Sequence, residues 1–239
     1  MKTAADKVPP GTQDRSDGPA ERKRGDGATA EQVTDILRAR ISRHDLQPGQ
    51  RIQEVLIATE FGISRARVRE VLGILEQRGL IERIPNRGAV VARLDAKEVY
   101  EIFDVREVLE GLAVRLATVN APDGAWDDLI EALGPAMEET IEAGDIERYL
   151  EVLDAVRERT LHWADSAHIT HFLDLVLDKA RVVARRVTLL PGRAKEGCGM
   201  HHRMLRHMAA REPEEAERCK REIIRTARAC LERYQSLVF

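Results

Sequence analysis

The chain has 239 residues, which is enough for two modest domains that each have a core of their own. Its formal net charge of -3 is too small to indicate a class of partner. No apolar run approaches the roughly 18 residues that a membrane span needs, so we expect no membrane partner. The N-terminal stretch lacks the apolar core of a signal peptide and the three cysteines have no C-x-x-C spacing, so we expect a cytoplasmic protein with reduced thiols.

Residues 1–27 are rich in Gly, Pro and charged side chains and contain almost no large apolar residue. Such a segment buries too little surface to order itself, so we expect a disordered tail. Residues 29–95 contain no lysine, and their arginines slightly outnumber their aspartates and glutamates. The rest of the chain is acidic. This asymmetry favours an anionic partner for the front half of the protein.

Three short helices are predicted after the tail. The first begins at a capping box, in which Thr29 is the N-cap and Gln32 reaches back to it. It ends at the Pro-Gly pair of LQPGQRI, and the second helix stops at Gly62. The third helix is capped by Ser64. Its apolar stripe consists of Val68, Val71, Leu72 and Leu75.

A hairpin follows the three helices. The β-prone runs LIERI and AVVARL flank the turn sequence PNRG. The order helix, helix, short turn, helix and hairpin indicates a winged helix-turn-helix domain, which we place at residues 28–94. A second capping box, DAKE, then opens a segment in which we expect about six or seven helices and no strands. The predicted fold is therefore mainly α, with an all-helical domain over residues 95–239.

The third helix presents arginines on the side opposite its apolar stripe. At roughly 100° per residue, the small residues Ala66 and Gly73 fall at the outward pole. Arg65 and Arg69 flank this pole on one side and Arg67 flanks it on the other. Small residues let the backbone approach a groove, where guanidinium groups reach phosphates or guanine edges. A solvated charged face is the alternative, but the neighbouring helix and hairpin favour a recognition helix for double-stranded DNA.

The string SR-x-x-VRE-x-L, continued by GLIE and PNRGA-x-V, resembles the DNA-binding domain of the GntR family of bacterial transcriptional regulators. The next segment, AKEVYEIFDVREVLEGLAVRLA, is similar to the start of the helical ligand-binding domain, called FCD, of its FadR-like subgroup. The resemblance covers about residues 29–235. It implies a homodimer that binds an inverted-repeat operator and responds to a small-molecule effector.

The DNA contacts expected from the helix pattern and the resemblance lie on the third helix and at the tip of the hairpin. They are Ser64, Arg65, Arg67, Arg69, Asn86, Arg87 and Gly88. Gly88 has no side chain to block close approach to the DNA. Some members of the family have a further operator-contacting arginine early in the second helix, but Val55 occupies that place here. The base preference therefore stays open.

Arg106 lies on an otherwise apolar helical stripe that includes Phe103 and Leu109. A buried cation must be paired, so two alternatives follow. Either Arg106 pairs with a neighbour such as Glu110, or it binds the carboxylate of a small effector.

The resemblance also implies where a metal would bind. Members of the subgroup often hold a divalent metal with an Asp, a His one turn later and two His from later helices. Asp154 matches the first ligand and His201 matches one of the later ones. Glu158 stands in the place of the first histidine, and Ile223 replaces the final one. One alternative is a divalent metal such as zinc, nickel or manganese on Asp154, Glu158 and His201; the other is a metal-free pocket in which these residues bind an organic ligand.

The expected function is therefore a sequence-specific transcriptional regulator, with repression the commoner mode in the family. A small acidic, carboxylate-bearing metabolite in the helical domain would control it. A metal-dependent enzyme on a helical scaffold is the alternative. The sequence has no Gly-rich phosphate loop, H-E-x-x-H motif or nucleophile elbow, so it favours the regulator.

Overall fold

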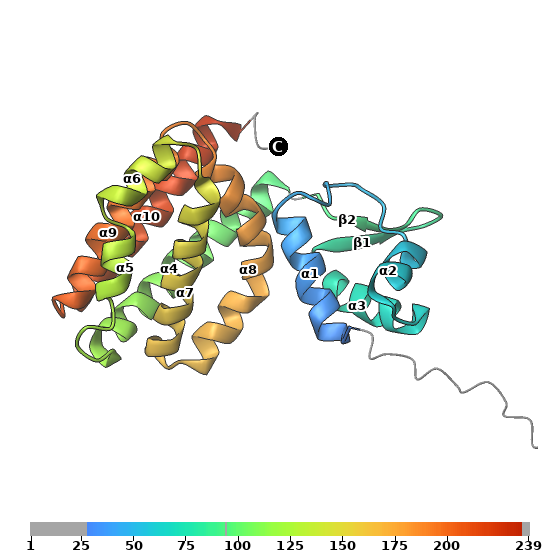
Figure 1. The fold of residues 1–239 in the computed structure, drawn as a ribbon, viewed down its shortest axis with the longest axis horizontal. Helices are drawn as coiled ribbons and strands as arrows, with labels where there is room; N and C mark the ends of the chain where they lie inside the picture. The colour runs from blue at the N-terminus through green and yellow to red at the C-terminus, as the bar shows by residue number, and fades with distance from the viewer. Residues whose placement is uncertain (1–27, 94, 236–239) are drawn as a thin grey trace, which may run out of the picture.

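A computed structural model describes residues 28–93 and 95–235, and Figure 1 shows its helices and its single hairpin. The disordered tail expected at residues 1–27 lies outside the described residues. The elements fall into two groups along the chain, an N-terminal group from α1 to β2 and a bundle from α4 to α10. No helix within the described ranges is both long and apolar enough to cross a membrane.

The first and third helices begin where cap chemistry predicts. The Thr29 hydroxyl accepts a hydrogen bond from the backbone N–H of Gln32 at 3.2 Å, and the Gln32 side chain accepts from the backbone N–H of Thr29 at 2.9 Å. Ser64 accepts from the backbone N–H of Arg67 at 3.2 Å. The elements of this group are α1 Ala30–Ser42, α2 Glu54–Phe61, α3 Arg65–Gln77, β1 Ile81–Ile84 and β2 Gly88–Val91.

The apolar stripe of α3 forms the centre of the N-terminal core. All four of its predicted members are fully buried, between α1 and the hairpin. β1 and β2 pair in antiparallel register, with Ile81 opposite Val91 and Ile84 opposite Gly88. The chain before α2 joins this small sheet through a bridge between Arg51 and Val90. The predicted winged helix-turn-helix fold is confirmed.

The rest of the described chain is a bundle of seven helices, as the sequence predicted. Five of its breaks fall at loops that contain Gly, Pro or Asp or that end directly before a proline, and one further break at Gly134 and Pro135 separates α5 from α6. The helices are α4 Ala96–Asn120, α5 Asp127–Ala132, α6 Pro135–Glu142, α7 Ile146–Ala164, α8 Ala167–Thr188, α9 Arg193–Ala209 and α10 Pro213–Arg233.

The capping box predicted at the start of α4 is wrong. Asp95 has the extended backbone of an N-cap residue, but its side chain makes no capping hydrogen bond. The Glu98 carboxylate, which would complete the box, accepts a hydrogen bond from the ammonium group of Lys179 on α8 instead. A tertiary ion pair has therefore replaced the local bond.

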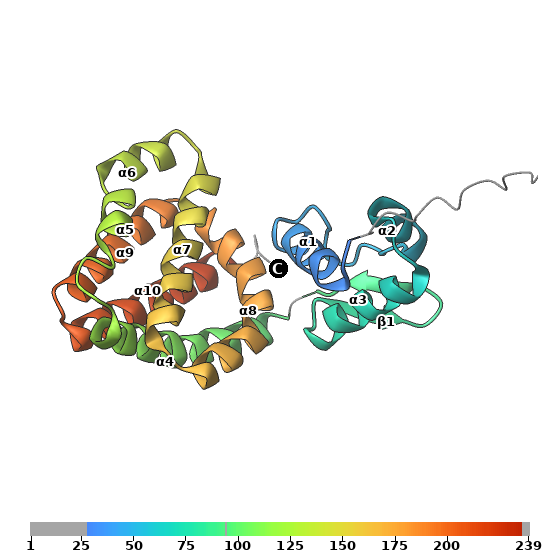
Figure 2. The same cartoon turned by 60° about the horizontal axis from the view of Figure 1, so that its bottom comes forward.

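Helix α8 connects the bundle to the N-terminal group. It lies beside α1 in both views of the ribbon (Figures 1 and 2). The side chain of Asp178 on α8 is only 3% exposed and accepts from Arg38 Nε at 2.9 Å and from Arg78 Nη1 at 3.0 Å. Val182, one turn further on, is part of the N-terminal core. The two groups thus share both an ion-pair cluster around the buried carboxylate of Asp178 and an apolar contact.

Candidate nucleic-acid interface and ligand cavity

The three arginines of α3 are all exposed at the start of the helix, as predicted. Because the apolar stripe holds the opposite side of α3 in the core, these side chains point away from the protein. Arg69 makes one contact within the protein, from its Nε to Glu54 Oε2 at 3.3 Å. An exposed pair of this kind contributes little, so Arg69 can exchange it for a phosphate or a base.

The tip of the hairpin is the second exposed feature of the N-terminal group. Asn86 and Gly88 both have a positive φ, of 65° and 78°, which is a backbone conformation that asparagine and glycine tolerate best. Asn86, Arg87 and Gly88 are exposed. The tip therefore offers an amide, a guanidinium group and an open stretch of backbone to a partner.

A cavity of about 640 Å³ lies between the helices of the bundle and reaches α1 of the N-terminal group. This volume suits a small organic ligand. The structure brings together around it all the residues that the sequence singled out in the helical segment. They are Arg106 from α4, Asp154 and Glu158 from α7, His201 from α9 and Ile223 from α10.

Arg106 pairs with Glu110, which is the first of the two predicted alternatives. Arg106 Nε donates to Glu110 Oε1 at 2.6 Å, and Lys220 Nζ lies 2.7 Å from Glu110 Oε2. Burial alone raises the pKa of Glu110, but the charges of Arg106 and Lys220 outweigh burial and hold this pKa far below its usual range. Two cations thus share one buried carboxylate, which leaves the cluster with a net positive charge.

His201 is neutral at the wall of the cavity. Its side chain is 8% exposed, and its Nδ1 lies 2.8 Å from the carbonyl oxygen of Gly197. Because a carbonyl can only accept, Nδ1 carries the ring proton and Nε2 is left as an acceptor. Burial, followed by the positive charge of Lys220, lowers the pKa of His201 to about 3.

The donor set around the cavity does not fit a divalent metal. Within the described residues, no three His, Cys, Asp or Glu side chains converge as a metal site requires. The Asp154 side chain is 59% exposed and pairs with Arg157 Nη2 at 3.1 Å. Ile223 presents a buried hydrocarbon side chain where a further ligand would have to be. Arginines and a lysine, which repel a metal cation, take the central positions instead.

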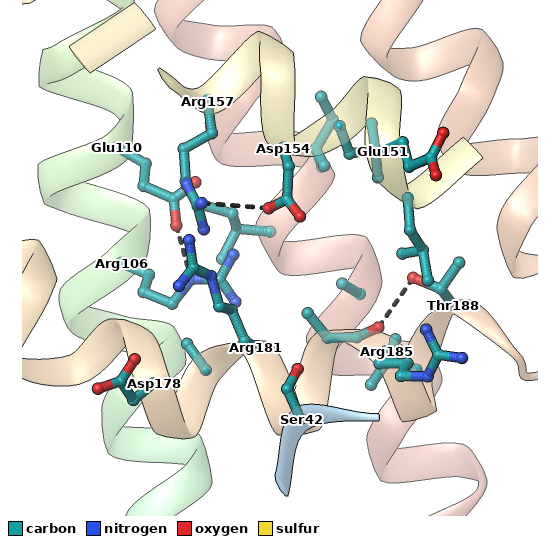
Figure 3. A pocket seen from close by; sticks show the side chains of 18 of the residues that line it. Ser42, Arg106, Glu110, Glu151, Asp154, Arg157, Asp178, Arg181, Arg185 and Thr188 are labelled. Atoms are coloured by element: carbon teal, nitrogen blue, oxygen red, sulfur yellow. Dashed lines mark hydrogen bonds and ion pairs between the residues drawn. The ribbon is translucent and has the colours of Figure 1, made fainter. Parts of the chain in front are cut away.

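Two arginines at the cavity were not predicted. Arg157 on α7 and Arg181 on α8 approach each other across the space between their helices, with Arg106 beside them (Figure 3). Both lie next to the apolar stripe of their helix, where an arginine ordinarily extends its head group to solvent. The sequence alone therefore carries no signal that distinguishes them. Only the packing of α7 and α8 places their guanidinium groups inside.

Comparison with family models matches both parts of the chain. Residues 29–91 match the model described as bacterial regulatory proteins, gntR family. Residues 101–226, more than half of the chain, match the FCD domain.

Individual proteins of similar sequence are also named as transcriptional regulators. An HTH-type transcriptional regulator of Bacillus subtilis (strain 168), YdhC, is 32% identical over 148 residues, which cover 59% of this chain and 63% of that protein. The gluconate operon transcriptional repressor of Bacillus licheniformis is 37% identical over 112 residues, 46% of this chain and 44% of that protein. The chain thus matches less than two thirds of the length of each.

A solved structure, E. coli McbR/YncC, superposes on 87% of this chain and 99% of its own, with a TM-score of 0.73 and 23% sequence identity. At this identity the likeness concerns the fold. It covers the N-terminal group and the helical bundle together.

Proposed function

The chain belongs to the GntR family of bacterial regulatory proteins, in the FadR-like subgroup that carries an FCD domain, and we propose that it is a sequence-specific DNA-binding transcriptional regulator. The observation that carries this proposal is the start of α3. Arg65, Arg67 and Arg69 are exposed there, on a helix whose opposite side is fixed in the core. Such a helix enters the major groove with its first turns.

Arg65 and Arg69 supply the base or phosphate contacts on one side of α3, and Arg67 supplies them on the other. Ser64 and the exposed hairpin tip, Asn86 to Gly88, add contacts to the backbone or the neighbouring groove. Two copies of the chain bind as a homodimer, since an inverted-repeat operator requires two-fold symmetry. This role places the protein in the cytoplasm.

Repression is the mode we propose. The Bacillus licheniformis relative, which is 37% identical over 112 residues, is named for repression of a gluconate operon. A small carboxylate-bearing metabolite in the cavity of the bundle would release the protein from DNA. Arg106, Glu158 and His201 line that cavity, and Asp154 lies at its opening. Because the family consists of regulatory proteins, the alternative of a metal-dependent enzyme has no support.

The cavity is well placed to influence the DNA-binding group. It is lined by α1 of that group as well as by α7 and α8 of the bundle. A ligand that binds more tightly to one arrangement of α1 and α8 than to another shifts the population toward that arrangement. The size of this shift is limited by the difference between the two affinities.

The proposal predicts that α3 supplies the specific contacts. The double variant Arg65→Ala/Arg69→Ala should bind the DNA upstream of its own gene about 100-fold more weakly or worse, because each base contact contributes about 1–3 kcal/mol. Fluorescence anisotropy with a labelled fragment measures the dissociation constant. Arg148→Ala, which removes an exposed arginine from α7, is the matched control and should bind like the wild type. Equal affinity of the double variant and the wild type would refute the assignment of α3.

A further inference from the structure

The middle of the cavity is crowded with positive charge from three helices. Arg106 comes from α4, Arg157 from α7 and Arg181 from α8, and Figure 3 shows their side chains extending toward the same space. Arg106 is already engaged by the buried carboxylate of Glu110, which Lys220 also contacts. The charges of Asp154, Glu110 and Glu158 offset part of the charge of Arg157. No carboxylate within the described residues, however, accepts a hydrogen bond from the Nε–H of Arg157 or of Arg181.

Arg157 and Arg181 both have unused hydrogen-bond donors. The Nε–H groups of both are buried and have no hydrogen-bond partner among the described residues. Arg157 uses Nη2 to contact Asp154, whose carboxylate faces mostly solvent. A buried guanidinium N–H without a partner costs free energy, because its hydrogen bond to water is lost on burial and is not replaced. Two such groups at the same cavity indicate that a partner is missing.

The two guanidinium groups also repel each other. Burial lowers the pKa of Arg157, and the charge of Arg181 lowers it further. An arginine nevertheless stays charged in a protein, so the repulsion is present rather than relieved by loss of a proton. An oxyanion between the two groups would remove both costs. It would accept hydrogen bonds from both Nε–H groups and would neutralise part of the charge.

We infer that Arg157 and Arg181 form a metal-independent binding site for an oxyanionic group, a carboxylate or a phosphate, of a small molecule in the cavity. This inference deepens the proposed function and rests on it, because it names the part of the effector that is recognised. The ring of His201, with Nε2 as an acceptor, lines the same cavity and can bind a hydroxyl group of the ligand. Apolar residues such as Leu150 and Ile224 complete the lining and suit a short carbon chain.

Thermal unfolding of the full chain tests the inference. The probes are gluconate, for a carboxylate, and inorganic phosphate, each at millimolar concentration with and without EDTA and compared with sodium chloride of equal ionic strength. At least one probe should raise the unfolding midpoint of the wild type by about 5 °C, since a ligand that binds only the folded state stabilises it. The probe that gives the larger shift distinguishes carboxylate from phosphate. A shift that disappears in EDTA, or no shift with either probe, would overturn the inference.

Variants of the two arginines distinguish a ligand-binding role of these residues from a structural one. Arg157→Gln and Arg181→Gln should each lose most of the shift, whereas Arg148→Gln on the exposed part of α7 should keep it. Without any probe, Arg181→Gln should unfold at the wild-type temperature or above it, because the repulsion is relieved. A fall of several degrees in this ligand-free midpoint would show that Arg181 is structural and would contradict the inference.

Failure of this inference can be told apart from failure of the proposed function. The affinity of the wild type for the upstream DNA is measured without any probe, so it does not depend on the cavity. Specific DNA binding together with an unchanged unfolding midpoint rejects the oxyanion site alone. A probe-induced shift together with equal affinity for all DNA rejects the regulator and leaves the oxyanion site established.

Discussion

At the scale of the residue, His201 is a buried group whose protonation opposes folding. Its pKa is lowered to about 3, first by burial and then by the charge of Lys220. In the unfolded chain a histidine has a pKa near 6.5. Between these two values the unfolded state binds more protons than the folded state, so the free energy of unfolding falls as the pH falls.

This difference predicts a stability loss in mild acid. Between about pH 7.5 and pH 5, His201 should remove about 2 kcal/mol from the free energy of unfolding, at about 1.4 kcal/mol per pH unit below the unfolded pKa. His201→Asn keeps a donor for the Gly197 carbonyl but does not titrate, so its stability should fall less over the same range. Urea unfolding at the two pH values measures the difference. His202→Asn, at the neighbouring residue of α9, is the control and should lose as much free energy of unfolding between the two pH values as the wild type. The prediction fails if His201→Asn loses the same amount.

At the scale of the element, α8 carries two features that face different partners. Asp178 binds Arg38 of α1 and Arg78 at the end of α3, and Arg181 extends into the cavity less than one helical turn away. Arg181 and the residue that holds the DNA-binding group, Asp178, therefore lie on the same part of α8. In the proposed function, an effector that contacts Arg181 would act on the helix that also contacts α1 and α3.

The ion pairs of Asp178 with Arg38 and Arg78 predict a large effect of a single substitution. Asp178→Ala would leave Arg38 and Arg78 without their shared carboxylate. Breaking a buried pair costs about 3–5 kcal/mol, and we expect about 2 kcal/mol because both arginines keep some contact with solvent. The thermal midpoint should fall by about 4–8 °C. Asp174→Ala, an exposed position one turn earlier on α8, should change it little. Equal midpoints of the two variants would show that the cluster does not hold the groups together.

Most elements could be predicted because their ends are encoded locally. Thr29 and Ser64 cap their helices with their own side chains, and the loops of the bundle contain the residues that stop helices. The capping box at Asp95 failed because Glu98 found a distant partner, Lys179, which no local pattern reveals.

The features of the cavity also include some that the sequence predicts and some that it does not. Arg106, Asp154, Glu158 and His201 were predicted from their spacing on helices and from the family resemblance, and the structure gathers them around one space. The pairing of Arg106 with Glu110 was one of the two predicted alternatives. The contact of Lys220 with Glu110 and the approach of Arg157 and Arg181 were not predictable, because they depend on which sides of α4, α7, α8 and α10 meet. Helical periodicity fixes the side of one helix but not its neighbour.

At the scale of the whole molecule, the protein is a DNA-binding group held against a helical bundle by one helix (Figures 1 and 2). The exposed arginines of α3 and the cavity lie in different parts of the fold, so the proposed effector would not compete with DNA for one surface. Their effects on each other must then be reciprocal: an effector that weakens DNA binding by some factor is itself bound more weakly by that factor on DNA.

The most direct test of the account is the affinity of the wild type for two DNA fragments at about 0.15 M salt. One fragment is the region upstream of its own gene, and the other is a scrambled sequence of the same length and composition. A sequence-specific regulator should bind the first about 10³-fold more tightly or better, whereas contacts to phosphates alone act on both fragments equally. Equal dissociation constants for the two fragments would contradict the account.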